Sequence, residues 1–130
     1  MRTFLLMLLV LTGTVGLAAA DELRYSGTYA ACMQAANGTT GGMVNCMVKE
    51  SARWDARMSK AYWSIKRGLE GQQGKRFLAA QRAWLKWRRA NAVYYSSATG
   101  GSIDRITSNQ SWLEATARRA LELEEMLKTY

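Results

Sequence analysis

Few side chains in this sequence could carry out chemistry. The 130 residues include no histidine, so a serine or cysteine nucleophile would have no histidine base to activate it. A glycosidase needs two carboxylates that face one cleft. Glu50 and Asp55 are five positions apart, a spacing that turns them onto different faces of a helix. The sequence therefore predicts that the protein is not an enzyme.

The chain has two cysteines, Cys32 and Cys46. In an oxidising compartment an even and closely spaced pair predicts one disulfide, and two free buried thiols are the alternative. Without histidine, a zinc site would have to combine these thiols with carboxylates alone, so we reject one. Neither a metal nor another cofactor is expected.

Three polar side chains interrupt stripes of otherwise apolar residues. Glu50 lies in one such stripe, and Gln81 and Arg88 lie in the next one along the chain. Because a buried arginine requires a carboxylate partner, we expect the three to form a structural polar network, with Glu50 paired to Arg88. A binding pocket is the alternative interpretation.

Apolar residues at three- and four-residue steps predict helices throughout. The expected helices cover residues 22–36, 43–69, 75–97 and a segment that starts between 103 and 110 and ends near 128. Glycine-rich stretches separate them. In the last helix an apolar seam recurs every seven residues, at Ile106, Leu113, Ala120 and Leu127, as in a helical bundle. The expected fold class is all-α: a small antiparallel bundle of about four helices with one disulfide.

The N-terminus has the order of a secretory signal peptide. Arg2 precedes an apolar run, and small residues at 18–20 come just before Asp21. A membrane anchor is the alternative, but polar and glycine residues interrupt the run well before the ~20 apolar residues that span a bilayer. We therefore predict a signal peptide over 1–20, a single domain over 21–130, no stable membrane insertion after cleavage, and a periplasmic or secreted location.

The chain is basic, with a formal charge of +8, or +7 once the predicted signal peptide and its Arg2 are removed. A basic surface favours anionic partners, and export argues against nucleic acid. Trp63, Trp87 and Tyr94 lie among the basic residues of the two central helices. This mixture could bind an anionic glycan such as peptidoglycan or lipopolysaccharide. It is also typical of a solvated helix face whose aromatic rings are covered by lysine and arginine stems.

Residues spread over most of the chain match the pattern of a known family. In order they are Cys32, Cys46, Glu50, Trp54, Asp55, Tyr62, the run Gln81-Arg82-Ala83-Trp84-Leu85, Arg88, Gly100, Gly101 and Ser102. From about residue 32 to 121 the chain resembles the LprI-like lysozyme-inhibitor family of small exported bacterial proteins. The resemblance implies a helical protein outside the cytoplasm that binds and inhibits a peptidoglycan hydrolase. Such a protein would be a lysozyme-type inhibitor or an immunity protein against a cell-wall-degrading toxin.

The sequence also departs from that family. Its members commonly have four cysteines, and the two missing here are expected near Asn91 or Ala92 and near Ser111. Arg89 stands where an acidic residue is usual. Without the second cross-link, we expect the connection before Ile103 to be freer.

That connection, residues 96–102, is rich in hydroxyl groups and glycine. In an inhibitor, hydroxyl or cationic donors could reach the paired carboxylates of a hydrolase. The predicted partner-binding residues are Ser97, Thr99, Gly100, Gly101, Ser102 and Arg105. An ordinary connector between antiparallel helices is the alternative, and a cell-envelope protein that binds anionic glycans through its basic helices is the alternative function.

Overall fold

The computed structural model describes residues 23–129, which form four helices and, within that range, no strand. The helices are α1 (Gly27–Ala36), α2 (Thr40–Gly68), α3 (Gly71–Tyr95) and α4 (Ile103–Leu127). The predicted all-α class is confirmed. The predicted signal peptide, residues 1–20, lies outside the described residues.

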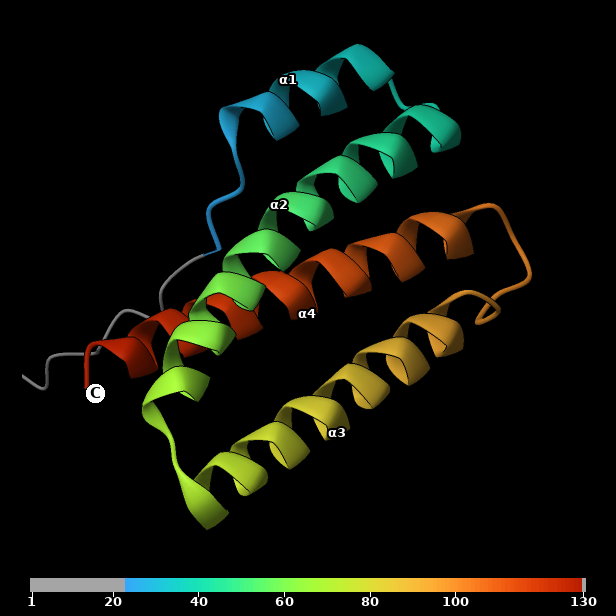
Figure 1. Cartoon of the computed structure of the whole chain (residues 1–130). Helices are drawn as coiled ribbons and strands as arrows, with labels where there is room; N and C mark the ends of the chain where they lie inside the picture. The colour runs from blue at the N-terminus through green and yellow to red at the C-terminus, as the bar shows by residue number, and fades with distance from the viewer. Residues whose placement is uncertain (1–22, 130) are drawn as a thin grey trace, which may run out of the picture.

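The core forms where α2 and α4 pack along each other, which is the largest interface between helices (Figure 1). The short α1 lies along α2, and α3 packs mainly on α4, with little direct contact to α2. The buried apolar side chains include Met47, Trp54, Met58, Ala61, Tyr62, Ile65, Leu113, Ala117, Ala120 and Leu123. The apolar stripes expected for the second and fourth helices therefore supply the core.

Local contacts explain where the first helices begin. The Ser26 side chain accepts a hydrogen bond from the Tyr29 N–H, so α1 starts at Gly27 rather than at residue 22. The α2 helix starts at Thr40, before the predicted start at residue 43, and includes Gly41 and Gly42 of the glycine-rich stretch. A Cβ at Gly42 would come within 2.9 Å of the Ala36 Cβ. Glycine at this position therefore lets the two helices approach closely.

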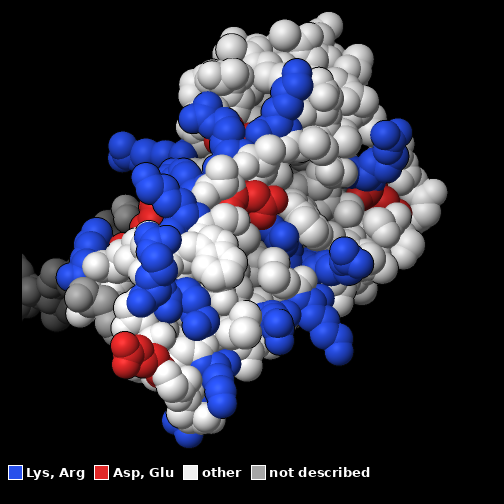
Figure 2. All heavy atoms as spheres, in the orientation of Figure 1, with Lys and Arg blue, Asp and Glu red and all other residues white. Residues whose placement is uncertain are grey.

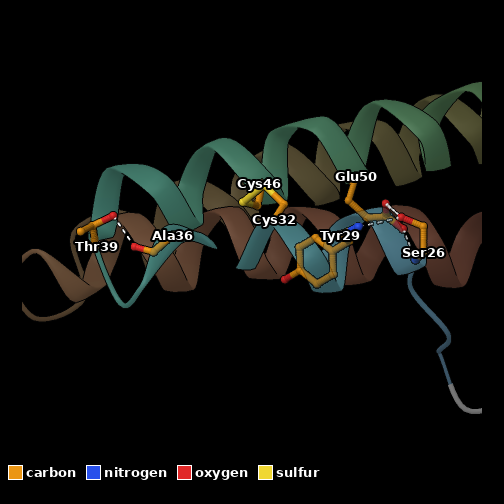
Figure 3. Close-up of a disulfide and its surroundings, with 7 residues drawn as sticks. All are labelled: Ser26, Tyr29, Cys32, Ala36, Thr39, Cys46 and Glu50. Atoms are coloured by element: carbon orange, nitrogen blue, oxygen red, sulfur yellow. Dashed lines mark hydrogen bonds between the residues drawn. A yellow bond between two sulfur atoms is a disulfide. The ribbon is translucent and has the colours of Figure 1, made fainter. Parts of the chain in front are cut away.

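Two links hold α1 against α2 (Figure 3). The predicted disulfide between Cys32 and Cys46 is present, with 5.7 Å between the Cα atoms. At the N-terminal end of α1, the Glu50 carboxylate accepts hydrogen bonds from the Ser26 N–H at 2.9 Å and the Ser26 hydroxyl at 2.7 Å. The helix has ten residues and buries none of them fully. Isolated helices this short are marginal in water, so α1 depends on these links.

Candidate functional site

The predicted partner-binding residues lie together at one end of the bundle (Figure 1). Five of them are in the connection between α3 and α4, and Arg105 is near the start of α4. All six are exposed: Ser97, Thr99, Gly100, Gly101, Ser102 and Arg105. Gly100 has a φ of +77°, a conformation that favours glycine. The structure thus brings these residues into one accessible surface segment.

The buried carboxylate of Asp104, in the first turn of α4, holds this connection in shape. It accepts hydrogen bonds from the Thr99 N–H at 3.1 Å, the Thr99 hydroxyl at 2.8 Å and the Gly100 N–H at 2.8 Å. The Thr99 hydroxyl in turn accepts one from the Gly101 N–H at 3.2 Å. Asp104 therefore ties the connection to the helix that follows, and the expectation of a connection freer than in cross-linked relatives stays a prediction.

Two opposing effects act on the pKa of Asp104. Desolvation of the carboxyl group raises the pKa, while hydrogen bonds from the Thr99 side chain and from the backbone of Thr99, Gly100 and Gly101 lower it. The hydrogen bonds prevail, so the pKa lies below its ordinary value of 3.8. Sequence reasoning missed Asp104. The signal available was an acidic residue in the first turn of a helix, just after a Thr-Gly-Gly sequence.

Large apolar side chains border the connection on both sides. Val93, Tyr94, Tyr95 and Ile103 are all exposed, Tyr94 to 66%. We call these four residues the loop collar. Exposed aromatic and aliphatic groups clustered around one segment are typical of protein-binding surfaces.

Arg88 is buried where α3 meets α2 and α4. Its Nη1 donates to the Asp55 carboxylate and to the Thr116 hydroxyl, each at 2.7 Å. The guanidinium also lies over the rings of Trp112, at 3.9 Å, and Trp84, at 5.0 Å. Arg88 thus joins three helices at a point where α2 and α3 have little other contact.

The expected pairing of Glu50, Gln81 and Arg88 is wrong, although all three are buried. Besides Ser26, Glu50 accepts a hydrogen bond from the Trp54 indole N–H at 3.1 Å. Gln81 accepts one from the Arg119 Nε at 3.0 Å. The prediction considered only the two consecutive helices that carry these three residues. The structure also supplies partners from α4 and from the segment before α1.

Two grooves flank α3. The first, of about 530 Å³, lies between α2 and α3 and includes Tyr62, Trp63, Arg82 and Arg88 in its walls. The second, of about 360 Å³, lies between α3 and α4 and includes Trp87, Tyr95 and Arg118. The sequence pattern did not indicate either groove.

Basic side chains are spread over the face seen in Figure 2, with few acidic ones between them. Some are neutralised locally: Arg57 pairs with Glu124 at 2.6 Å and Arg118 with Glu114 at 2.7 Å. The hydrogen bonds that Arg57 donates to the Glu124 carboxylate raise the pKa of Arg57, and burial of the guanidinium opposes this rise. Within residues 23–129, no cluster of cysteine and acidic side chains could hold a metal ion. In the same range, no helix has the length and apolar character needed to cross a membrane.

Comparison with known proteins agrees with the resemblance drawn from the sequence. The family model described as lysozyme inhibitor LprI matches residues 32–123, which is most of the chain and includes the disulfide, Arg88 and the α3–α4 connection. No curated protein and no solved structure matches the chain. The four-helix domain described above therefore belongs to the LprI family of lysozyme inhibitors.

Proposed function

We propose that this protein inhibits a peptidoglycan hydrolase of the lysozyme type, and that the α3–α4 connection enters the cleft of the target enzyme. The family membership supports inhibition as the activity. The observation that carries the choice of surface is the exposed connection held by Asp104 and bordered by the loop collar.

The arrangement suits cleft binding for two reasons. A segment that is already ordered by Asp104 loses less conformational entropy on binding than a flexible one. The Ser97 and Ser102 hydroxyls and the Arg105 guanidinium are exposed donors. Such groups can hydrogen-bond to the paired carboxylates that glycosidases use. The loop collar would then contact the rim of the cleft.

Charge narrows the class of target. After removal of residues 1–20 the protein has a formal charge of +7, so it would be repelled at long range by a basic hydrolase such as an animal-type lysozyme. An acidic hydrolase would associate faster. An enzyme of this kind delivered by a competing bacterium would make the protein an immunity protein.

The test is an inhibition assay in which lysis of cell walls is followed by turbidity with basic and acidic hydrolases. The double substitution Ser102→Tyr and Arg105→Glu alters exposed side chains and leaves the Asp104 hydrogen bonds in place. Since interface centres carry most of the binding energy, it should raise the inhibition constant at least ~10-fold.

The matched control is Gln72→Tyr with Arg76→Glu, which makes the same kind of change at exposed positions near the opposite end of α3. It should inhibit as the unmodified protein does. Equal inhibition constants for the two double variants would reject the α3–α4 connection as the contact surface.

The basic surface favours a second candidate, a cell-envelope protein that binds anionic peptidoglycan or lipopolysaccharide. Such binding should weaken steeply as ionic strength rises. Inhibition through an occluded cleft should change far less with salt, so binding measured at low and high salt separates the two functions.

A further inference from the structure

The outer side of α3 is not covered by any other helix of residues 23–129. One side of α3 packs on α4, and the helix barely touches α2. From residue 82 to residue 94 every exposed side chain of α3 is basic or apolar: Arg82, Ala83, Leu85, Lys86, Trp87, Arg89, Ala90, Val93 and Tyr94. A helix face that only contacts water usually mixes charges of both signs. The composition of this face therefore indicates a binding surface.

Four basic side chains form a straight line along this face, which we call the cationic line. They are spaced by seven, four and three positions and are Lys75, Arg82, Lys86 and Arg89. Helical geometry places them within about 60° of each other around the axis and over about 21 Å of its length. Figure 2 shows basic side chains along the part of the surface that α3 occupies in Figure 1.

The charges of the cationic line are not neutralised within residues 23–129. All four side chains are exposed, and none of them takes part in an ion pair in that range. The α3 helix itself contains no aspartate or glutamate. Unlike Arg57 or Arg118, which pair with glutamates of α4, these four side chains are available to an anionic partner.

Apolar side chains lie on both flanks of the cationic line. By the same helical geometry Leu85 is on one flank and Trp87 on the other, and they are 38% and 52% exposed. Three small exposed residues, Ala79, Ala83 and Ala90, lie between the line and Trp87. The Trp87 ring is thus not covered by the stems of its basic neighbours. A tryptophan ring beside basic groups is typical of the boundary between water and a lipid bilayer.

The shape of the face favours a flat partner. It is the convex side of a helix, and the grooves beside α3 lie on its flanks, whereas sites for small ligands are concave. A soluble polyanion could neutralise the cationic line but would leave Trp87 in water. An anionic bilayer meets both features, because its phosphate groups attract basic residues and its headgroup layer accommodates apolar side chains.

We propose that the outer face of α3 binds the surface of an anionic phospholipid bilayer. The cationic line contacts the lipid phosphates, and Leu85 and Trp87 enter the headgroup layer. The α3 helix then lies along the bilayer, and no helix has to span it. The α3–α4 connection follows the end of α3, so the bound protein presents this connection next to the membrane. The proposal does not depend on the inhibitory function.

Sedimentation with lipid vesicles tests this surface on the protein purified after export. The unmodified protein should bind vesicles of phosphatidylcholine with phosphatidylglycerol, and should not bind phosphatidylcholine alone. The triple variant Arg82→Gln, Lys86→Gln and Arg89→Gln should bind about 100-fold more weakly at low salt. Its melting temperature should not fall, because the three side chains are exposed and form no ion pairs within residues 23–129.

The matched control removes the same charge from exposed positions of α2, by Lys49→Gln, Lys60→Gln and Arg67→Gln. This variant should bind the vesicles far more tightly than the α3 variant, because it keeps the cationic line.

Fluorescence tests the place of the tryptophan. Lipids brominated close to the headgroup quench tryptophans that reach them. The quenching should be lost in Trp87→Phe and retained in Trp63→Phe, which removes a ring exposed to a similar extent on α2.

The contrary outcomes are distinct. Absence of binding to the anionic vesicles at low salt, or equal weakening in the two triple variants, would overturn the α3 surface. Quenching that persists in Trp87→Phe would overturn the orientation proposed for the helix. Tighter binding to insoluble peptidoglycan than to the vesicles, lost in the same α3 variant, would overturn the lipid partner in favour of a glycan. These assays contain no hydrolase, so their failure is distinguishable from failure of the proposed inhibition.

Discussion

The Asn91 side-chain amide donates a hydrogen bond to the Ser111 hydroxyl at 2.7 Å and so connects α3 to α4. These are the positions near which the family resemblance leads us to expect the second cysteine pair that this chain lacks. Close by, the Ser108 hydroxyl donates to the Ala92 carbonyl at 2.8 Å. Hydrogen bonds therefore join the two helices here where a covalent bond is expected in relatives.

Replacing both residues, Asn91→Cys with Ser111→Cys, should produce a second disulfide. Closing a loop of this length stabilises the folded chain by roughly 3 kcal/mol on the chain-entropy estimate. Mass spectrometry would report the bond, and urea denaturation would report the free energy of unfolding. The reduced double variant is the control and should be no more stable than the unmodified protein. A bond that formed without raising stability would mean that the helices must move apart to accommodate it.

Removal of Asp55 and removal of Arg88 should lower the free energy of unfolding by different amounts. The Arg88 side chain is 8% exposed and that of Asp55 37%. Asp55→Ala leaves a buried cation without its counter-charge and should cost about 3 kcal/mol, whereas Arg88→Met leaves a carboxylate that water can reach and should cost about half as much. Urea denaturation of both variants and the double variant measures the coupling between the two side chains. The reverse order would contradict the burial argument.

Acid should loosen the α3–α4 connection through Asp104. In the folded protein the pKa of Asp104 is lowered relative to 3.8. The carboxylate therefore contributes its full stabilisation at a pH above the pKa of the unfolded chain, and this stabilisation is lost as the pH falls through the pKa of the folded protein. The melting temperature should therefore drop from pH 5 to about pH 2 more steeply in the unmodified protein than in Asp104→Asn. Parallel curves for the two proteins would show that the carboxylate contributes nothing.

Reduction of the disulfide should free α1 before the rest of the fold. Cys32→Ser should lower the free energy of unfolding by roughly 3 kcal/mol in oxidising buffer. After reduction of the unmodified protein, the two proteins should be equally stable. Hydrogen exchange should then be fastest in residues 27–36, because none of these residues is fully buried and the helix relies on Glu50 and the disulfide. Exchange that increased equally in all helices would show that α1 is part of the global unfolding unit.

Several elements of the fold could be predicted from the sequence. The apolar steps from Met47 to Ile65 and the seam through Leu113 and Ala120 are buried as expected. The errors are at helix starts. The sequence predicts a glycine-rich turn before a helix that begins at residue 75, but Gly71 and Gly74 both lie in α3. Gly71 begins the helix with a φ of +54°, a conformation that favours glycine. Gly74 is buried, and a Cβ there would lie 3.1 Å from the Leu69 carbonyl oxygen.

For the buried polar residues, the sequence predicts burial but not the hydrogen-bond partners. Burial of Glu50, Gln81 and Arg88 followed from their place in apolar stripes. Their partners depend on which helices meet, and the sequence order of the helices does not specify that. The role of Asp104 required the turn geometry around Gly100, and the α2–α3 groove required the spacing of whole helices.

The packing of α2 on α4 also has a consequence for the order in which the chain folds. Trp54 and Leu113 share one core but lie on helices separated in the sequence by all of α3. A ribosome or a translocation channel that releases the chain from its N-terminus delivers α4 last. Until then α2 exposes its apolar side chains and α3 lacks its main support, so nascent molecules need protection from proteases and aggregation. A product truncated before residue 103 should never acquire a protected core.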